Sequence, residues 1–175
     1  GLPGGAVGGR AEILDMIAFR GDPEWDSRRR ISHPGTFNAN PLSAAAGSVC
    51  LEMLASQPIN QQADAAAQRL KRGLNEVLAR LEVPGHAHGI ASVINITWAN
   101  CDCDRELCTM PHEQIKKANR PAIQQAFKRT MLNAGVDVMG GRGFLVSAVH
   151  TAKDIDDTLA AFEEAVTAMR REGIV

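Results

Sequence analysis

One short segment carries groups that could hold an anion. Gly35-Thr36 precedes Asn40-Pro41, and proline is favoured in the first turn of a helix. The N–H groups near a helix N-terminus and the Thr36 hydroxyl can donate hydrogen bonds to an anion such as a phosphate. From the residues alone, the alternative is that Thr36 only caps the helix.

Three of the four cysteines are crowded into one stretch. The spacing is Cys101-x-Cys103-x4-Cys108, and His112 follows after three more residues. Thiolates and imidazoles are the ligands that zinc prefers, but this spacing matches no familiar pair of Cys-x2-Cys knuckles. The spacing leaves two interpretations open, a zinc site and an insertion loop with incidental thiols. We adopt the second as the prediction and assign no metal ligand.

One arginine and several histidines are weaker candidates. Arg142 could bind a substrate carboxylate through two parallel hydrogen bonds, and a solvated loop arginine is the alternative. His33 stands beside the Gly-Thr pair, while His86, His88 and His150 are expected at loop or strand ends. Because no partner for them is visible in the sequence, packing or capping roles are predicted.

The opening run GLPGGAVGG at 1–9 invites comparison with nucleotide-binding loops. It is not followed by Gly-Lys-Ser or Gly-Lys-Thr, and its spacing is not Gly-x-Gly-x-x-Gly at the start of a helix, so both motifs are excluded. Glycine and proline at this density favour turns and close approach of the backbone to another group.

Hydrophobic periodicity predicts the elements that must position these groups. Helices are expected at 42–54, 60–81 and 121–134, and a last helix should begin at the capping box Thr151-x-x-Asp154; strands are expected at 92–98, 136–139 and 144–149. The small residues of 42–54 predict a helix that is buried on most sides. The whole pattern predicts α+β structure packed on one face of a sheet, with long loops at 20–36 and 99–112.

Composition excludes several classes of protein. The 175 residues carry 19 Lys and Arg against 20 Asp and Glu, a net charge of −1, so no bulk positive field favours nucleic acid or an anionic membrane. No apolar run reaches the roughly 20 residues that span a bilayer. Few cysteines and the absence of a signal-peptide pattern at the start lead us to expect a cytoplasmic protein with reduced thiols.

Three motifs together resemble one enzyme family. They are GLPGGAVGG at 1–9, HPGTFNANPL at 33–42 and FLVSAVHT at 144–151, the last followed by Asp154-Ile155-Asp156. In this order and at these separations they resemble the class III pyridoxal-phosphate-dependent aminotransferases, particularly the glutamate-1-semialdehyde 2,1-aminomutase branch of porphyrin biosynthesis. The resemblance implies an α/β fold of the type I pyridoxal-phosphate transferases, pyridoxal 5'-phosphate as cofactor, a homodimer, and an amino acid or amino-ketone as substrate.

The resemblance also says which parts of such an enzyme this chain holds. In the family, the glycine-rich strand closely follows the lysine that forms the Schiff base with the cofactor. None of the five lysines present lies in a matching context, and all are expected to be exposed: Lys71, Lys116, Lys117, Lys128 and Lys153. The chain is therefore expected to be the C-terminal part of a longer enzyme, to contain no catalytic lysine, and to be inactive alone.

Gly35 and Thr36 match the family residues that bind the cofactor phosphate in the neighbouring subunit's active site. The resemblance assigns 1–55 to a remnant of the large domain, 56–84 to a connecting helix and 85–175 to a small α+β C-terminal domain. The aminomutase pattern has an acidic residue before the strand that begins near Gly143, where this chain has Gly140-Gly141-Arg142. This departure favours a general aminotransferase over an aminomutase.

A second hypothesis treats the chain as a complete, non-catalytic α+β module. Its function would be to bind zinc through Cys101, Cys103 and Cys108. Metal content and the upstream coding sequence distinguish it from the aminotransferase hypothesis.

Overall fold

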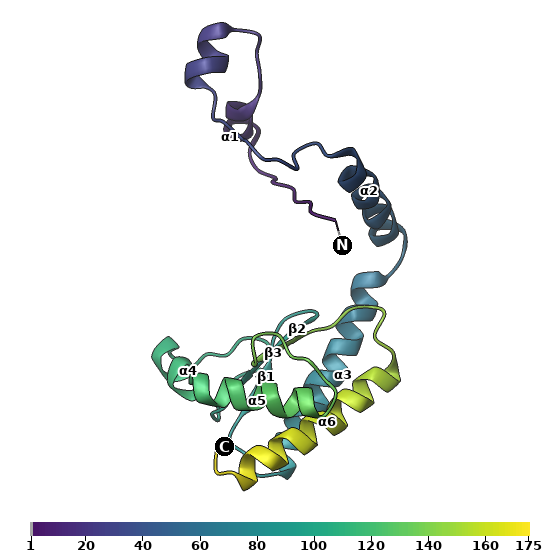
Figure 1. The fold of residues 1–175 in the computed structure, drawn as a ribbon, viewed down its shortest axis with the longest axis vertical. Coiled ribbons are helices and arrows are strands. Elements are labelled where there is room, and N and C mark those ends of the chain that lie inside the picture. Colours follow the sequence, from purple (N-terminus) through teal and green to yellow (C-terminus); the bar gives the residue numbers. More distant parts are fainter. Residues whose placement is uncertain (1) are drawn as a thin grey trace. The chain divides into compact units, whose positions relative to one another are not determined.

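The chain divides into two units between Gln57 and Pro58, and a computed structural model describes residues 2–175 (Figure 1). Gly1, the first residue of the glycine-rich run, lies outside the described residues. The rest of that run, up to Gly9, is exposed and belongs to no helix or strand.

The first unit has a small centre around one tryptophan. Three short helical turns, α1 (Ala11–Leu14), η1 (Asp15–Ile17) and the π-helical η2 (Trp25–Arg29), precede α2 (Pro41–Ser56). Within residues 2–57 only Trp25 is buried; its indole Nε1 donates a hydrogen bond to the Ala18 carbonyl at 3.0 Å. The Arg20 guanidinium carbon lies 3.6 Å from the centroid of the same ring. The loop predicted at 20–36 therefore contains a helical turn.

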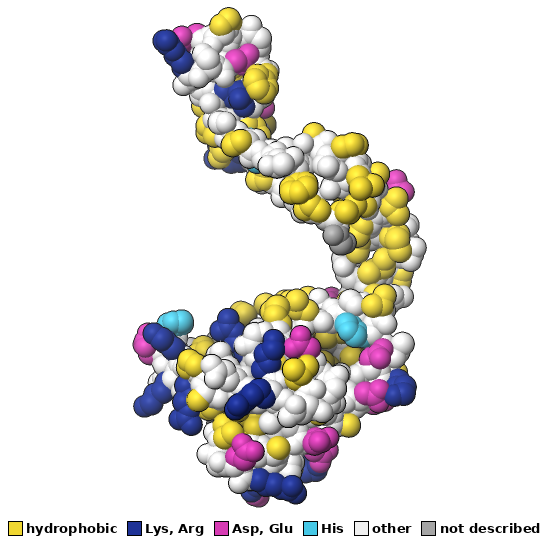
Figure 2. Space-filling view, viewed as in Figure 1, with side chains coloured by type: hydrophobic (Ala, Val, Ile, Leu, Met, Phe, Trp, Pro, Cys, Tyr) yellow, Lys and Arg dark blue, Asp and Glu magenta, His cyan; other side chains and the backbone are white. Residues whose placement is uncertain are grey.

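Helix α2 forms where the sequence predicts it, but it is not buried. Asn40 caps it, because its side chain accepts a hydrogen bond from the Ser43 N–H at 3.0 Å, and Pro41 occupies the first turn. None of its residues is buried, and large apolar side chains such as Leu42 and Leu51 are exposed. Figure 2 shows apolar side chains gathered along this helix. The predicted burial is wrong for this chain, because the first unit, at residues 2–57, provides no surface that covers the helix.

The second unit is an antiparallel sheet with helices on one face. Its elements are α3 (Ile59–Arg80), β1 (His86–His88), β2 (Val93–Thr97), α4 (His112–Ala118), α5 (Pro121–Asn133), β3 (Gly143–Leu145) and α6 (Ala152–Arg171). The strand order is β1-β2-β3, with Ala87 opposite Ile96 and Ile94 opposite Phe144. Successive residues of a strand face opposite sides, so Ile94 is buried while its neighbour Val93 is exposed. The predicted α+β layer on one sheet face is confirmed.

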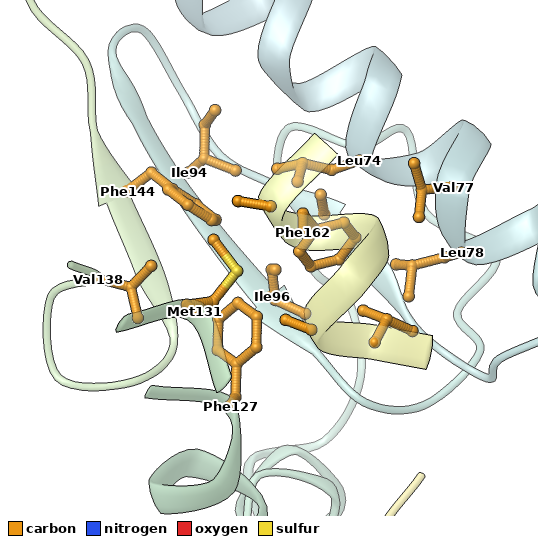
Figure 3. Close-up of a cluster of buried hydrophobic side chains, with 14 of the residues drawn as sticks. Leu74, Val77, Leu78, Ile94, Ile96, Phe127, Met131, Val138, Phe144 and Phe162 are labelled. Carbon is orange, nitrogen blue, oxygen red and sulfur yellow. The ribbon is translucent and has the colours of Figure 1, made fainter. Parts of the chain in front are cut away.

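The core of this unit is centred on aromatic side chains. Phe127 of α5 is fully buried, and its ring meets Phe162 edge to face at 5.8 Å between centroids and Trp98 at 5.3 Å. The apolar stripe of α3 that includes Leu74 packs into the same core. Figure 3 shows Leu74 of α3, Phe127 of α5 and Phe162 of α6 converging with side chains of the sheet.

The ends of the elements follow local chemistry, and two strands differ from prediction. The Thr151 and Asp154 capping box opens α6, and Gly135 takes a positive φ of 89° after α5, as predicted. The strand predicted at 136–139 is reduced to one bridge between Met139 and Gly143, because Gly140 and its neighbour adopt positive φ and turn the chain. The strand predicted at 144–149 is the short β3.

Candidate functional site

The segment before α2 forms a turn in which the Asn38 side chain lies against Gly35. The Asn38 N–H donates a hydrogen bond to the Gly35 carbonyl at 3.0 Å, and the Asn38 side-chain amide donates to the His33 carbonyl at 2.9 Å. A Cβ atom at position 35 would lie 2.5 Å from Asn38 Oδ1. Any larger residue at Gly35 would therefore displace the amide that holds the turn.

Thr36 is exposed in this turn and does not cap the helix. The N-cap of α2 is Asn40, so the capping alternative for Thr36 is wrong. Among residues 2–175, the side-chain hydrogen bonds of this segment are made by Asn38 and Asn40, and none involves the Thr36 hydroxyl. It lies just ahead of the N-terminus of a 16-residue helix, whose backbone dipole favours negative charge. A free hydroxyl, a side-chain-free glycine and a helix N-terminus are groups that fit a phosphate.

The second group of chemically active side chains lies in the second unit, where the cysteine loop meets β1. There are two sets of three possible ligand atoms, and within each set the atoms lie within 4.8 Å of one another. One set comes from His86, Cys101 and Cys103, and the other comes from His86, His88 and Cys108. The Sγ atoms of Cys101 and Cys108 are 4.0 Å apart. His112, which the sequence spacing had included, is the exposed first residue of α4 and belongs to neither set.

Burial controls the protonation of this cluster. It lowers the pKa of the His88 imidazole to about 4, with further lowering by the positive charges of His86, Lys71 and Arg105. Burial also lowers the pKa of His86.

The thiols respond in opposite directions. Burial acts to raise the pKa of the Cys101 thiol, but hydrogen bonds from Thr109, Cys103 and Cys108 outweigh it and lower that pKa. Burial raises the pKa of Cys108. Of the two thiols, Cys101 is therefore the one whose thiolate is favoured. Because burial lowers the pKa of both His86 and His88, both imidazoles are neutral at pH 7.

The histidines of β1 were the members of this cluster that the sequence interpretation missed. His86 and His88 alternate on a three-residue strand, and their approach to the cysteines depends on how the loop at 99–111 folds back. The only signal available was the His-x-His repeat followed by three cysteines.

One lysine is not where it was predicted. Lys71 is only 6% exposed, and its ammonium donates a hydrogen bond to the Gly89 carbonyl at 2.8 Å. The prediction of an exposed side chain is wrong because Lys71 borders the apolar stripe of α3, where its methylene groups can be buried. The other four lysines, at 116, 117, 128 and 153, are exposed as predicted.

The remaining candidates have ordinary surroundings. Arg142 is exposed in the turn before β3, as the solvated alternative predicted. His150 accepts a hydrogen bond from the Ser147 N–H at 2.9 Å and so has a local turn-capping role, as predicted. His33 is exposed beside the Gly-Thr pair. No helix among residues 2–175 combines the length and apolar character needed to cross a membrane.

Comparison with curated proteins finds relatives that include glutamate-1-semialdehyde 2,1-aminomutases. No protein-family model matches the chain. Glutamate-1-semialdehyde 2,1-aminomutase of Methanococcoides burtonii is 30% identical over 165 residues, which is 93% of this chain and 35% of that enzyme. The aminomutase of Pyrobaculum arsenaticum is 28% identical over 174 residues, 98% of this chain and 38% of the enzyme. The chain thus spans about a third of the length of the curated relatives it matches.

Several solved structures have a similar fold, and they include transaminases. A β-phenylalanine aminotransferase from Variovorax paradoxus matches with a TM-score of 0.69 and 25% identity, over 94% of this chain and 35% of that one. An omega-transaminase from Sphaerobacter thermophilus matches with a TM-score of 0.68 and 25% identity, over 93% and 35%. The FumI protein of Sphingopyxis sp. MTA144, solved with PLP, matches with a TM-score of 0.65 and 24% identity, over 82% and 31%.

Proposed function

We propose that this chain, which matches curated aminomutases over almost its whole length, forms the phosphate-anchoring and C-terminal part of a class III pyridoxal-phosphate-dependent aminotransferase. Its solved neighbours confirm the expected fold class, fold type I. One neighbour, the FumI protein, was solved with PLP, which supports pyridoxal phosphate as the cofactor of this chain. The reaction we propose moves an amino group on an amino acid or amino-ketone. The observation that carries the proposal is the free Thr36 hydroxyl beside Gly35 at the start of α2.

Gly35 and Thr36 are proposed to hold the cofactor's phosphate. The Thr36 hydroxyl and the backbone N–H groups of the turn can donate hydrogen bonds to phosphate oxygens. Asn38 keeps the turn closed around Gly35, where a side chain would intrude. When bound, the cofactor's ring supplies a sink for the negative charge that develops on the substrate carbon. This chain's own contribution is to fix the position of the phosphate.

The lysine that binds the cofactor is proposed to lie upstream of residue 1. None of the five lysines present matches the family context, and the only buried one, Lys71, is already bonded to the Gly89 carbonyl. We therefore propose that the chain alone does not transfer amino groups. The domain division at 1–55, 56–84 and 85–175 belongs to the same proposal.

A homodimer in which Thr36 serves the neighbouring subunit's site is also proposed. Support comes from the first unit, where α2 exposes large apolar side chains of the kind that a partner surface ordinarily buries. They are Leu42, Val49, Leu51, Met53 and Leu54. The substrate is a small molecule, and the cytoplasm is the proposed location. Whether the amino group moves within one molecule or between two is decided by assaying the full-length enzyme with glutamate-1-semialdehyde and with amino acid donors.

Substitution of Thr36 tests the phosphate anchor. In the full-length enzyme, Thr36→Ala removes a hydrogen bond to a charged group, worth roughly 1.5–3 kcal/mol, so we expect the dissociation constant for pyridoxal phosphate to rise about 10-fold to 100-fold. Thr36→Ser keeps the hydroxyl and is the matched control, expected to bind like the unsubstituted enzyme. Equilibrium titration with the cofactor measures both. Equal affinity of all three proteins would contradict the assignment of Thr36.

A further inference from the structure

A buried histidine in the second unit has a ring nitrogen without a partner. His86 is fully buried, and its Nδ1 lies 2.9 Å from the Ala99 carbonyl oxygen. Since a carbonyl oxygen only accepts, Nδ1 carries the proton and Nε2 presents a lone pair. Among residues 2–175, Nε2 has no hydrogen-bond partner. Imidazoles that bind metal ions commonly have this arrangement, with the non-coordinating nitrogen donating to a backbone carbonyl.

The sulfur atoms next to this histidine are spaced as metal ligands are. The Sγ atoms of Cys101 and Cys108 are 4.0 Å apart. Two sulfurs bound at 2.3 Å to one tetrahedral zinc ion would be separated by about 3.8 Å. The ligand atoms of His86, Cys101 and Cys103 all lie within 4.8 Å of one another. Cys108 and His86 also share a second such set with His88, so the same imidazole borders all three sulfurs.

A second imidazole lies beside the cluster but is already engaged. The rings of His86 and His88 are 5.0 Å apart between centroids. His88 Nε2 is 3.2 Å from the Thr97 hydroxyl, so this nitrogen has a partner within the sheet. The free nitrogen of His86 and the three sulfurs make four ligands, which fills a tetrahedral site and leaves no open position for a substrate.

Nearby positive charges match the charge of such a site. Three thiolates and one zinc ion carry a net charge of −1. Arg105 and Lys71 act on the β1 imidazoles as positive charges. The Arg105 guanidinium also donates to the Cys101 carbonyl at 3.5 Å, and the Gly89 N–H donates to the Arg105 carbonyl at 3.1 Å. The loop that carries the cysteines therefore also carries a cation, Arg105, in contact with the backbone of Cys101.

We propose that His86, Cys101, Cys103 and Cys108 form a structural zinc site that fastens the loop at 99–111 to strand β1. The site has a closed set of ligands from two segments, strand β1 and the loop that follows β2. It lies in the second unit and takes no part in the proposed amino transfer. Its failure in a test would leave the assignment of Thr36 untouched.

Metal analysis of the full chain is the first test. Purified from medium containing zinc and kept reduced, the chain is expected to hold about one zinc ion after exhaustive dialysis. Cys101→Ser and Cys108→Ser should each lower the zinc content at least about 10-fold. Cys50→Ser is the matched control, since Cys50 is an exposed thiol on α2, and its zinc content should equal that of the unsubstituted chain.

Cobalt titration of the unsubstituted chain provides a second test that no folding defect can obscure. After removal of zinc with a chelator, Co²⁺ should give an intense sulfur-to-metal absorption band that saturates at one equivalent and disappears when zinc is added. His86→Gln should weaken cobalt binding, whereas His112→Gln should not, because His112 lies outside the cluster. Full zinc content in Cys101→Ser, no cobalt–sulfur band, or a disulfide between Cys101 and Cys108 in the freshly purified chain would each overturn the proposal.

Discussion

Phe127→Ala is expected to destabilise the second unit by about 3–5 kcal/mol, the usual range for removing a fully buried aromatic ring. Phe127 has no exposed surface, and its ring contacts three other aromatic rings, those of Trp98, Phe144 and Phe162. Its loss would leave a cavity between the sheet and α6. Since small domains are stable by about 5–15 kcal/mol, much of the total would be lost.

Chemical denaturation monitored by tryptophan fluorescence measures this effect, because Trp98 lies against the substituted ring. Phe19→Ala is the matched control. Phe19 is 73% exposed in the first unit, so its removal should leave the midpoint of the second unit nearly unchanged. A loss below about 1 kcal/mol for Phe127→Ala would mean that this ring does not fill the core as described.

Among glycine-to-alanine substitutions, Gly89→Ala is expected to be the most destabilising, lowering the free energy of unfolding by at least about 2 kcal/mol. Gly89 has a φ of +152°, which is costly for residues with a side chain, and an added Cβ would lie 2.0 Å from the Val93 carbonyl oxygen. That oxygen is backbone and cannot swing away, so the turn between β1 and β2 must open. The Gly89 carbonyl also accepts the hydrogen bond from the buried Lys71 ammonium, and this ammonium would lose its partner if the turn opened.

Gly135→Ala separates the cost of backbone strain from the cost of the steric clash found at Gly89. Gly135 also has a positive φ, of 89°, but an added Cβ would meet nothing within 4 Å. Its substitution should therefore cost only about 1 kcal/mol, from the left-handed conformation alone. Thermal and denaturant unfolding of the two variants compare the costs directly. If both lost the same stability, the close approach of Gly89 to the β2 backbone would be refuted.

Periodicity predicted the long helices of the second unit because each of them carries its apolar stripe in its own residues. The stripe that includes Leu70, Leu74 and Leu78 defines α3 without reference to any other segment. The strand β1 was missed because its three residues alternate histidine with alanine and give no apolar signal. Burial of α2 was predicted wrongly because small residues indicate a close neighbour but not which chain or domain supplies it.

The two candidate sites differ in how much of each the sequence could predict. Gly35 and Thr36 are adjacent, so a sequence motif is enough to propose the anchor, although only the structure identifies Asn40 as the helix cap. The proposed metal site joins strand β1 to a loop that begins more than ten residues later. The cysteines were visible in the sequence, but His86 entered the cluster only through the pairing of β1 with β2 and the return of the loop.

The central claim is that this chain is one part of a pyridoxal-phosphate enzyme whose lysine lies upstream. Borohydride reduction of the full-length enzyme, followed by peptide mass spectrometry, locates the lysine that carries the cofactor. The account predicts one pyridoxyl-lysine, on a residue shortly before Gly1, and none on Lys71 or the four exposed lysines of this chain. A pyridoxyl group on any of these five lysines, or a full-length protein that binds no pyridoxal phosphate, would contradict it.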